Sequence, residues 1–91
     1  MNLSQLKNDL KEMIVETLLL EDIQPDEIGD DAALFGEGLG LDSIDALELV
    51  VAIEKQFDVI IEDEEVGRQA FASISALADF IVEKKRADIP N

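Results

Sequence analysis

Apolar residues recur at helical spacing in three separate stretches of the chain, and no stretch shows the sustained alternation of a half-buried strand. The first stretch runs from about Leu3 to Leu20, the second from Ser43 to about Phe57, and the last begins after Ser73 or Ser75. Each predicts an amphipathic helix whose apolar face packs against the other two. The predicted core residues of the three helices are Leu6, Leu10 and Ile14, then Leu49, Val50, Ile53 and Phe57, then Ile74, Leu77 and Ile81.

A fourth and shorter helix is predicted from about Asp63 to Gln69, with Asp63 as its N-cap. Gly67 lies inside it and costs about 1 kcal/mol relative to alanine, so we expect this helix to be short or irregular. The fold class that follows is all-α: a small antiparallel bundle of three main helices plus one short helix, with a long first crossover loop. The whole chain, residues 1–91, is predicted to form a single domain.

The crossover from Glu21 to Leu41 contains a proline and several glycines, which break regular structure. A loop of this length in a compact domain needs apolar anchors. The sequence offers several that can hold it across the helix ends: Ile23, Ile28, Leu34, Phe35 and Leu39.

Composition limits the function of such a bundle. The chain has 91 residues, a formal net charge of -15, and 47% hydrophobic residues, so the charge lies on the surface of a folded protein rather than in a disordered one. Such a surface repels nucleic acids and anionic membranes and favours partners with basic patches, although it also simply keeps a small protein soluble. We expect a cytoplasmic monomer that neither binds nucleic acid nor inserts into a membrane.

The second helix is unusual because it carries two apolar stripes. Ala46, Leu49, Val50, Ile53 and Phe57 form the stripe that faces the core. Contact with the crossover or the short helix is one reading of the other stripe, and a partner surface with an acidic edge is the reading we favour. The other stripe and its edge consist of Ile44, Leu47, Val51, Glu48, Glu54 and Lys55.

The segment Gly40–Asp45, followed by Leu47-Glu48-Leu49, resembles the attachment motif of acyl carrier proteins, and the similarity continues through Glu54 and Phe57-Asp58. The resemblance implies that 4'-phosphopantetheine is attached covalently to Ser43 by a phosphopantetheinyl transferase, with coenzyme A as the donor. It implies a carrier of acyl thioesters that serves acyl-loading and acyl-processing enzymes with basic docking patches. The partner-binding residues are then Asp42, Ile44, Asp45, Leu47, Glu48, Val51 and Glu54.

Enzyme chemistry is disfavoured by the residues that the chain lacks. There is no histidine and no cysteine, so Ser43 has no usual base and is better read as a substrate of another enzyme. The glycines at 36, 38 and 40 fit no phosphate-binding fingerprint and suggest a flexible approach to the serine. The acidic run Glu62–Glu65 lacks the spacing of a calcium loop, so a solvated acidic face is the better interpretation.

Two questions stay open at the level of sequence. Lys55 and Gln56 stand where fatty-acid carriers usually continue with acids, and Phe71 looks inserted, which favours a specialised lipid, polyketide or aryl-polyene carrier over a housekeeping one. The alternative function is an acidic helical docking module without a cofactor. That module would explain the charge and the second stripe, but it would leave Asp42-Ser43-Ile44 at the helix start as a coincidence.

Overall fold

The computed structural model describes residues 2–35 and 40–88 of the chain. Its element order is α1 (Leu3–Thr17), a 3-10 turn η1 (Pro25–Glu27), α2 (Ser43–Phe57), α3 (Glu64–Ala70) and α4 (Ile74–Asp88). Three long helices and one short one were predicted, and this all-helical fold is confirmed. In the described ranges the only β-type pairing is an isolated bridge between Phe35 and Leu41.

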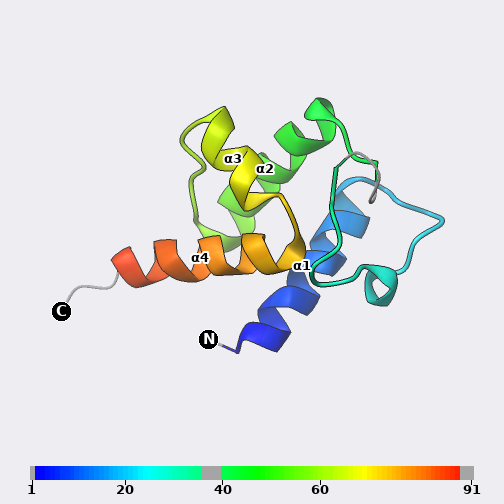
Figure 1. Cartoon of the computed structure of the whole chain (residues 1–91), viewed down its shortest axis with the longest axis horizontal. Coiled ribbons are helices and arrows are strands. Elements are labelled where there is room, and N and C mark those ends of the chain that lie inside the picture. Colours follow the sequence, from blue (N-terminus) through cyan, green and yellow to red (C-terminus); the bar gives the residue numbers. More distant parts are fainter. Residues whose placement is uncertain (1, 36–39, 89–91) are drawn as a thin grey trace.

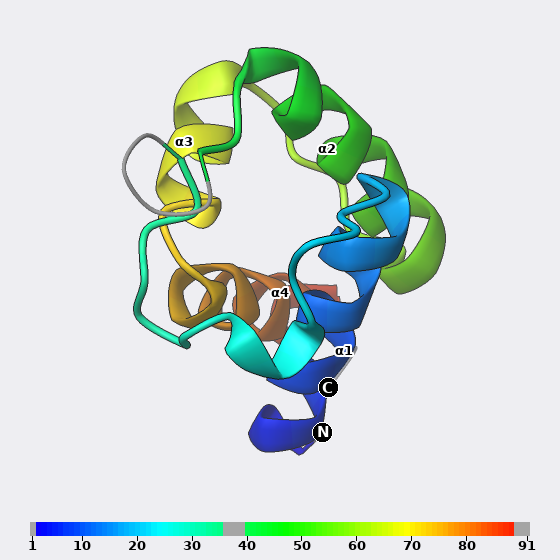
Figure 2. The same ribbon diagram turned by 90° about the vertical axis from the view of Figure 1, so that its right-hand side faces the viewer.

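The arrangement of the helices is visible in two perpendicular views (Figures 1 and 2). Helices α1 and α2 run in opposite directions, and the long crossover with η1 connects the end of one to the start of the other. Helix α4 packs on α1, and α3 packs on α4. No helix in residues 2–35 and 40–88 is long and apolar enough to span a bilayer.

Helix α1 ends earlier than the apolar pattern predicts. The prediction extended it to Leu20, but the helix stops at Thr17, and Leu19 takes a left-handed conformation with φ 53°. The Leu20 N–H donates to the Val15 carbonyl, and the Leu19 N–H donates to that of Glu16, which is the pattern of a Schellman cap. The turn lets Leu20 pack beside the core while Leu19 remains 80% exposed. At the other end Asn2 is the N-cap, and its side chain accepts the Gln5 N–H at 3.2 Å.

The core lies where the faces of α1, α2 and α4 meet. All but two of the ten predicted core residues are buried there; Val50 and Phe57 from α2 are only partly buried. Leu34 and Ile28 from the crossover are buried in the same core, and Ile23 and Phe35 pack against it, as predicted. The fifth predicted anchor, Leu39, lies outside the described residues, as do Gly36, Gly38 and the last three residues of the chain.

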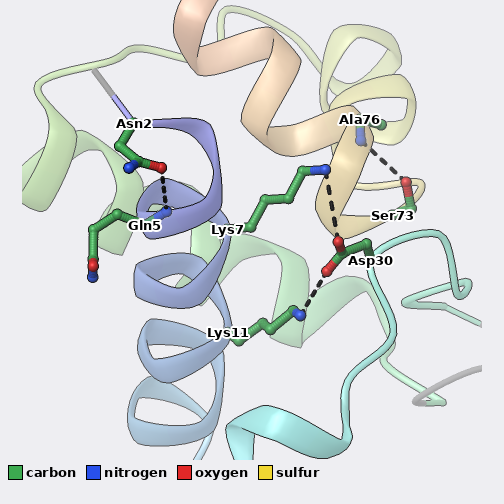
Figure 3. A network of polar contacts seen from close by, with 7 residues as sticks. All are labelled: Asn2, Gln5, Lys7, Lys11, Asp30, Ser73 and Ala76. Atoms are coloured by element: carbon green, nitrogen blue, oxygen red, sulfur yellow. Dashed lines mark hydrogen bonds and ion pairs between the residues drawn. The ribbon is translucent and has the colours of Figure 1, made fainter.

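The crossover is fixed to the helices through Asp30 (Figure 3). The Asp30 carboxylate forms ion pairs with Lys11 Nζ at 2.6 Å and with Lys7 Nζ at 3.7 Å. Both lysines belong to α1. The backbone carbonyl of Asp30 accepts the Ser75 N–H of α4 at 2.8 Å. Ser73 caps α4, since its hydroxyl accepts the Ala76 N–H at 3.1 Å. One loop residue therefore connects α1 to α4, and the loop that precedes α2 is held across both helices.

Candidate functional site

The N-terminus of α2 is held by a reciprocal pair of aspartates. One oxygen of Asp42, Oδ1, accepts the N–H groups of Ile44 and Asp45, each at 3.0 Å. The Asp45 carboxylate reaches back and accepts the Asp42 N–H at 3.1 Å. This capping box satisfies donors that the first turn of a helix leaves without partners. Asp42 and Asp45 therefore fix the start of α2, in addition to any role in binding a partner.

Ser43 is the first residue of α2 and is exposed to solvent. It follows Asp42 directly, so the capping box fixes the backbone on both sides of the serine. Leu41, the residue before the cap, is buried and its N–H donates to the Leu34 carbonyl at 3.2 Å. The Ser43 side chain is thus accessible from solvent, while the backbone that carries it is fixed to the core.

One face of α2 is exposed although it is apolar. Ile44 is 68% exposed, Leu47 67% and Val51 48%, whereas Leu49 and Ile53 on the opposite face are fully buried. The two predicted stripes are therefore confirmed as one buried and one exposed face. The other interpretation of the second stripe was contact with the crossover or the short helix. Neither of these segments covers the three side chains, which remain exposed. The acidic residues Glu48 and Glu54 are exposed beside them.

A pocket of about 810 Å³ opens between α2 and α3, and Ser43 is part of its wall. This volume lies within the range of small-molecule sites in proteins. The wall is mostly apolar, and its charged members are Arg68 from α3 and Asp63, the residue before that helix. Asp63 also caps α3, because its Oδ1 accepts the Val66 N–H at 2.8 Å. The full lining is Ala33, Phe35, Leu41, Ser43, Ala46, Leu47, Val50, Ile61, Asp63, Gly67, Arg68, Phe71 and Ala72.

The sequence did not predict a functional role for most of the residues that line the pocket. Leu47 and Ser43 were predicted functional residues and do line the pocket, but Gly67 and Phe71 were noted only for other reasons. Phe35 and Phe71 meet edge to face, with ring centroids 6.4 Å apart. The available signals were a glycine within a helical segment and an extra phenylalanine beside it. Neither says where α3 lies relative to α2, which is set by the tertiary packing.

The acidic run Glu62–Glu65 lies at the start of α3. Among the described side chains, no group of three or more histidine, cysteine, aspartate or glutamate residues is placed to hold a metal ion. Glu62 instead lies 4.0 Å from Lys84 of α4, at an exposed position where such a pair contributes little to stability.

Comparison with known proteins agrees with this arrangement. A family model described as a phosphopantetheine attachment site matches residues 8–81. An acyl carrier protein from Sulfurovum sp. (strain NBC37-1) is 41% identical over 76 residues, which is 84% of this chain and 93% of that protein. An acyl carrier protein from Wolinella succinogenes is 41% identical over 63 residues, or 69% of this chain and 78% of that protein.

The chain belongs to the acyl carrier protein family. Its cofactor is 4'-phosphopantetheine, and it is a carrier of acyl groups rather than an enzyme. The structure is compatible with that cofactor, since an exposed serine borders an apolar pocket next to an exposed helix face. The docking module without a cofactor is therefore overturned as the alternative, because the match to the attachment-site family spans most of the bundle.

Proposed function

We propose that Ser43 is the residue to which phosphopantetheine is attached. The observation that carries the proposal is the position of this serine: exposed, first in α2, held by the Asp42 cap and part of the pocket wall. A helix N-terminus favours an anion, so a phosphodiester at this position gains from the helix dipole. Asp42 and Asp45 oppose it by charge, but both carboxylates already accept backbone N–H groups of the first turn.

The attachment is a phosphoryl transfer in which this chain is the acceptor. The Ser43 oxygen forms a bond to the coenzyme A phosphorus that carries the pantetheine. The bond from that phosphorus to the bridging oxygen of the pyrophosphate breaks, and adenosine 3',5'-bisphosphate leaves with the electron pair. The hydroxyl proton passes to a base of the transferase, since this chain has no histidine and its neighbouring aspartates act as caps. Once attached, the arm supplies a terminal thiol that holds an acyl group as a thioester.

The pocket between α2 and α3 is the place proposed for the carried acyl group. It borders Ser43, and its wall is built mainly from apolar side chains of α2, α3 and the crossover. Burial of apolar surface from water favours the acyl group in the pocket by about 25 cal/mol for each Å² removed. The carrier thereby protects its cargo between enzymes.

The exposed face of α2 is the proposed docking surface for the transferase and for acyl-loading and acyl-processing enzymes. We define this docking face as Asp42, Ile44, Asp45, Leu47, Glu48, Val51 and Glu54. Its acids attract basic patches over distance, and its apolar side chains are removed from water on contact. Asp45 is only partly exposed, so its share in such contacts is smaller than that of Glu48 or Glu54. A surface this narrow suits contacts that form and dissolve quickly.

The pathway is proposed to be a specialised lipid, polyketide or aryl-polyene one rather than housekeeping fatty-acid synthesis. Lys55 and Gln56 are exposed near the end of α2 and make that end less acidic than its start. Phe71, the residue that looks inserted, is fully buried and forms part of the pocket. The departures from the usual pattern thus lie next to the docking face, directly after Glu54, and in the wall of the cargo pocket.

The intact mass of the purified chain after incubation with coenzyme A and a broad-specificity transferase tests the attachment. We expect a gain of one phosphopantetheine unit in the unaltered protein and none in Ser43→Ala. Ser4→Ala is the matched control, because Ser4 is also an exposed serine in the first turn of a helix. A gain that persists in Ser43→Ala would place the arm on another residue, and no gain in the unaltered chain would overturn the proposal.

A further inference from the structure

Gly67 occupies a position where helix propensity argues against glycine. It lies in the middle of α3, its N–H donates to the Asp63 carbonyl at 3.0 Å, and its carbonyl accepts the Phe71 N–H at 2.8 Å. The residue is therefore an ordinary helical one, and the only described glycine with a positive φ is Gly40. The backbone at 67 does not require the conformational freedom for which glycine is usually selected.

The packing around Gly67 does not require glycine either. A Cβ atom added there would lie 3.5 Å from Cγ2 of Ile61, which is ordinary van der Waals contact, and no other described side chain comes within 4 Å. Gly67 is nonetheless buried, and it forms part of the pocket wall between α2 and α3. The missing side chain therefore leaves open space, and that space belongs to the pocket.

The rest of the wall also includes small residues beside this space. Small residues line the pocket from three other segments: Ala46 from α2, Ala33 from the crossover and Ala72 after α3. Phe35 and Phe71 also line the pocket, and their two rings meet edge to face. A straight saturated chain needs little width, whereas a planar ring fills a broad slot and packs favourably against aromatic side chains.

We propose that Gly67 sets the width of the cargo pocket, and that the pocket is built for a ring-bearing acyl group rather than a straight saturated chain. This inference rests on the proposed attachment at Ser43, because the acyl group must enter from an arm on that residue. Gly67 contacts the carried group directly in this arrangement and acts as a specificity-determining residue.

The test compares octanoyl and phenylacetyl groups, which have the same number of carbon atoms. A broad-specificity transferase transfers each acyl-phosphopantetheine from its coenzyme A thioester to the full chain, and intact mass confirms the loading. The readout is the rate of thioester cleavage by hydroxylamine, divided by the rate for the same acyl group on free coenzyme A. In the unaltered protein we expect the phenylacetyl thioester to be protected about two- to ten-fold more than the octanoyl one, the range of an added aromatic contact.

Variants at Gly67 assign this preference to the pocket width. In Gly67→Leu we expect the preference for phenylacetyl to disappear while loading stays complete. Gly67→Ala adds one methyl group, so it should reduce the preference in part and raise the melting temperature of the unloaded chain by about 4–8 °C. Gln69→Leu is the matched control, because Gln69 is exposed on the same helix and does not line the pocket; it should keep the full preference.

The outcomes separate the two proposals. Failure of any acyl-phosphopantetheine to appear on the unaltered chain would overturn the attachment at Ser43, and with it the acyl pocket. Complete loading with equal normalised cleavage rates for the two acyl groups would overturn only the ring-bearing cargo. A preference that survives unchanged in both Gly67→Leu and Gly67→Ala would show that Gly67 does not set the width. If Gly67→Leu fails to fold, Gly67→Ala decides alone.

Discussion

The two sides of α2 are packed in different ways. On its core side, toward α1 and α4, the helix buries Leu49 and Ile53 completely, in one hydrophobic cluster with Leu10 and Leu77, which are also fully buried. Toward α3 it contributes Ala46 and Val50 to an open pocket, whose opposite wall includes a glycine. Large branched side chains fill the space on the first side. On the second side, small residues such as Ala46 and Gly67 leave a pocket open.

This difference separates stability from the proposed function within one helix. A close-packed interior resists any change in volume, so the side toward α1 and α4 cannot admit cargo without loss of stability. The side toward α3 borders a pocket that can be empty or filled. Few contacts on this side hold the fold together, because α3 packs on α4 and the pocket separates α3 from α2. On the proposed role of the pocket, the carrier binds and releases an acyl group while its core stays unchanged.

The largest effect on this comparison is expected from Ile53→Ala. Ile53 is fully buried on the core side of α2, and an isoleucine-to-alanine change at such a site lowers the free energy of unfolding by about 2–5 kcal/mol. Val51→Ala on the exposed face should change it by about 0.5 kcal/mol or less. Urea denaturation of the two variants measures both values.

The same pair of variants should show the reverse order in loading. Val51 belongs to the docking face, so Val51→Ala should slow transfer of phosphopantetheine while the chain stays folded. Ile53→Ala, assayed at a temperature where it is still folded, should be loaded at the rate of the unaltered chain. Equal losses of stability in the two variants would contradict the division of α2 into a core side and a functional side.

A smaller effect is expected at Asp42, where structure and docking overlap in one residue. Asp42→Ala removes the acceptor of two N–H groups in the first turn of α2 and should lower the free energy of unfolding by about 0.5–2 kcal/mol. Asp42→Asn keeps an oxygen at the cap and removes only the charge, so its stability should stay close to that of the unaltered chain. Thermal unfolding of both variants measures how much the Asp42 cap contributes to the stability of the fold.

Loading kinetics then measure the charge of Asp42 separately. Because a rim charge mainly affects the association rate, Asp42→Asn should be loaded more slowly at low salt and nearly normally at high salt. A loading rate for Asp42→Asn that equals that of the unaltered chain at low salt would limit Asp42 to the cap and remove it from the docking face.

The sequence predicted α2 from Ser43 to Phe57 with both ends correct, because chemistry local to the chain sets those ends. Asp42 caps the start, and the end coincides with Asp58 in a left-handed conformation at φ 56°, a state that aspartate adopts more readily than most residues. The end of α1 was missed by three residues because Leu18-Leu19-Leu20 contains no breaker. That helix stops where tertiary packing places Leu18 and Leu20 against the core.

The candidate site divides in the same way. Ser43, its cap and the exposed stripe of α2 depend on spacing within one helix, so helical periodicity was enough to predict them. The pocket depends on the distance between α2 and α3, which no local pattern encodes. In the sequence, Gly67 was notable only as a residue with low helix propensity inside a predicted helix. The structure places it in the wall of the pocket, where a missing side chain leaves space. The single domain, the monomer and the pathway stay predictions.

The smallest effect is expected for the crossover, which Asp30 connects to α1 and α4. The hydrogen bond from Lys11, together with the charges of Lys11 and Lys7, lowers the pKa of the Asp30 carboxyl in the folded chain. A lowered pKa in the folded state means that the ionised carboxylate stabilises the fold above its unfolded pKa of about 3.9, and that this contribution is lost as the pH falls through the lower folded value. Asp30→Asn should therefore melt slightly below the unaltered chain at neutral pH, and the two melting curves should converge in acid.

Comparing the two proteins at each pH isolates Asp30, because the other acids of this highly charged chain titrate in both. Lys11→Gln should reproduce most of the neutral-pH difference and Lys7→Gln less of it, since their Nζ atoms lie 2.6 Å and 3.7 Å from the Asp30 carboxylate. The Ser75 N–H bond to the Asp30 backbone carbonyl remains in all three variants, which keeps the effect small. A difference in melting temperature that stays constant into acid would show that the crossover is held by the backbone bond and buried Leu34, with no contribution from the carboxylate.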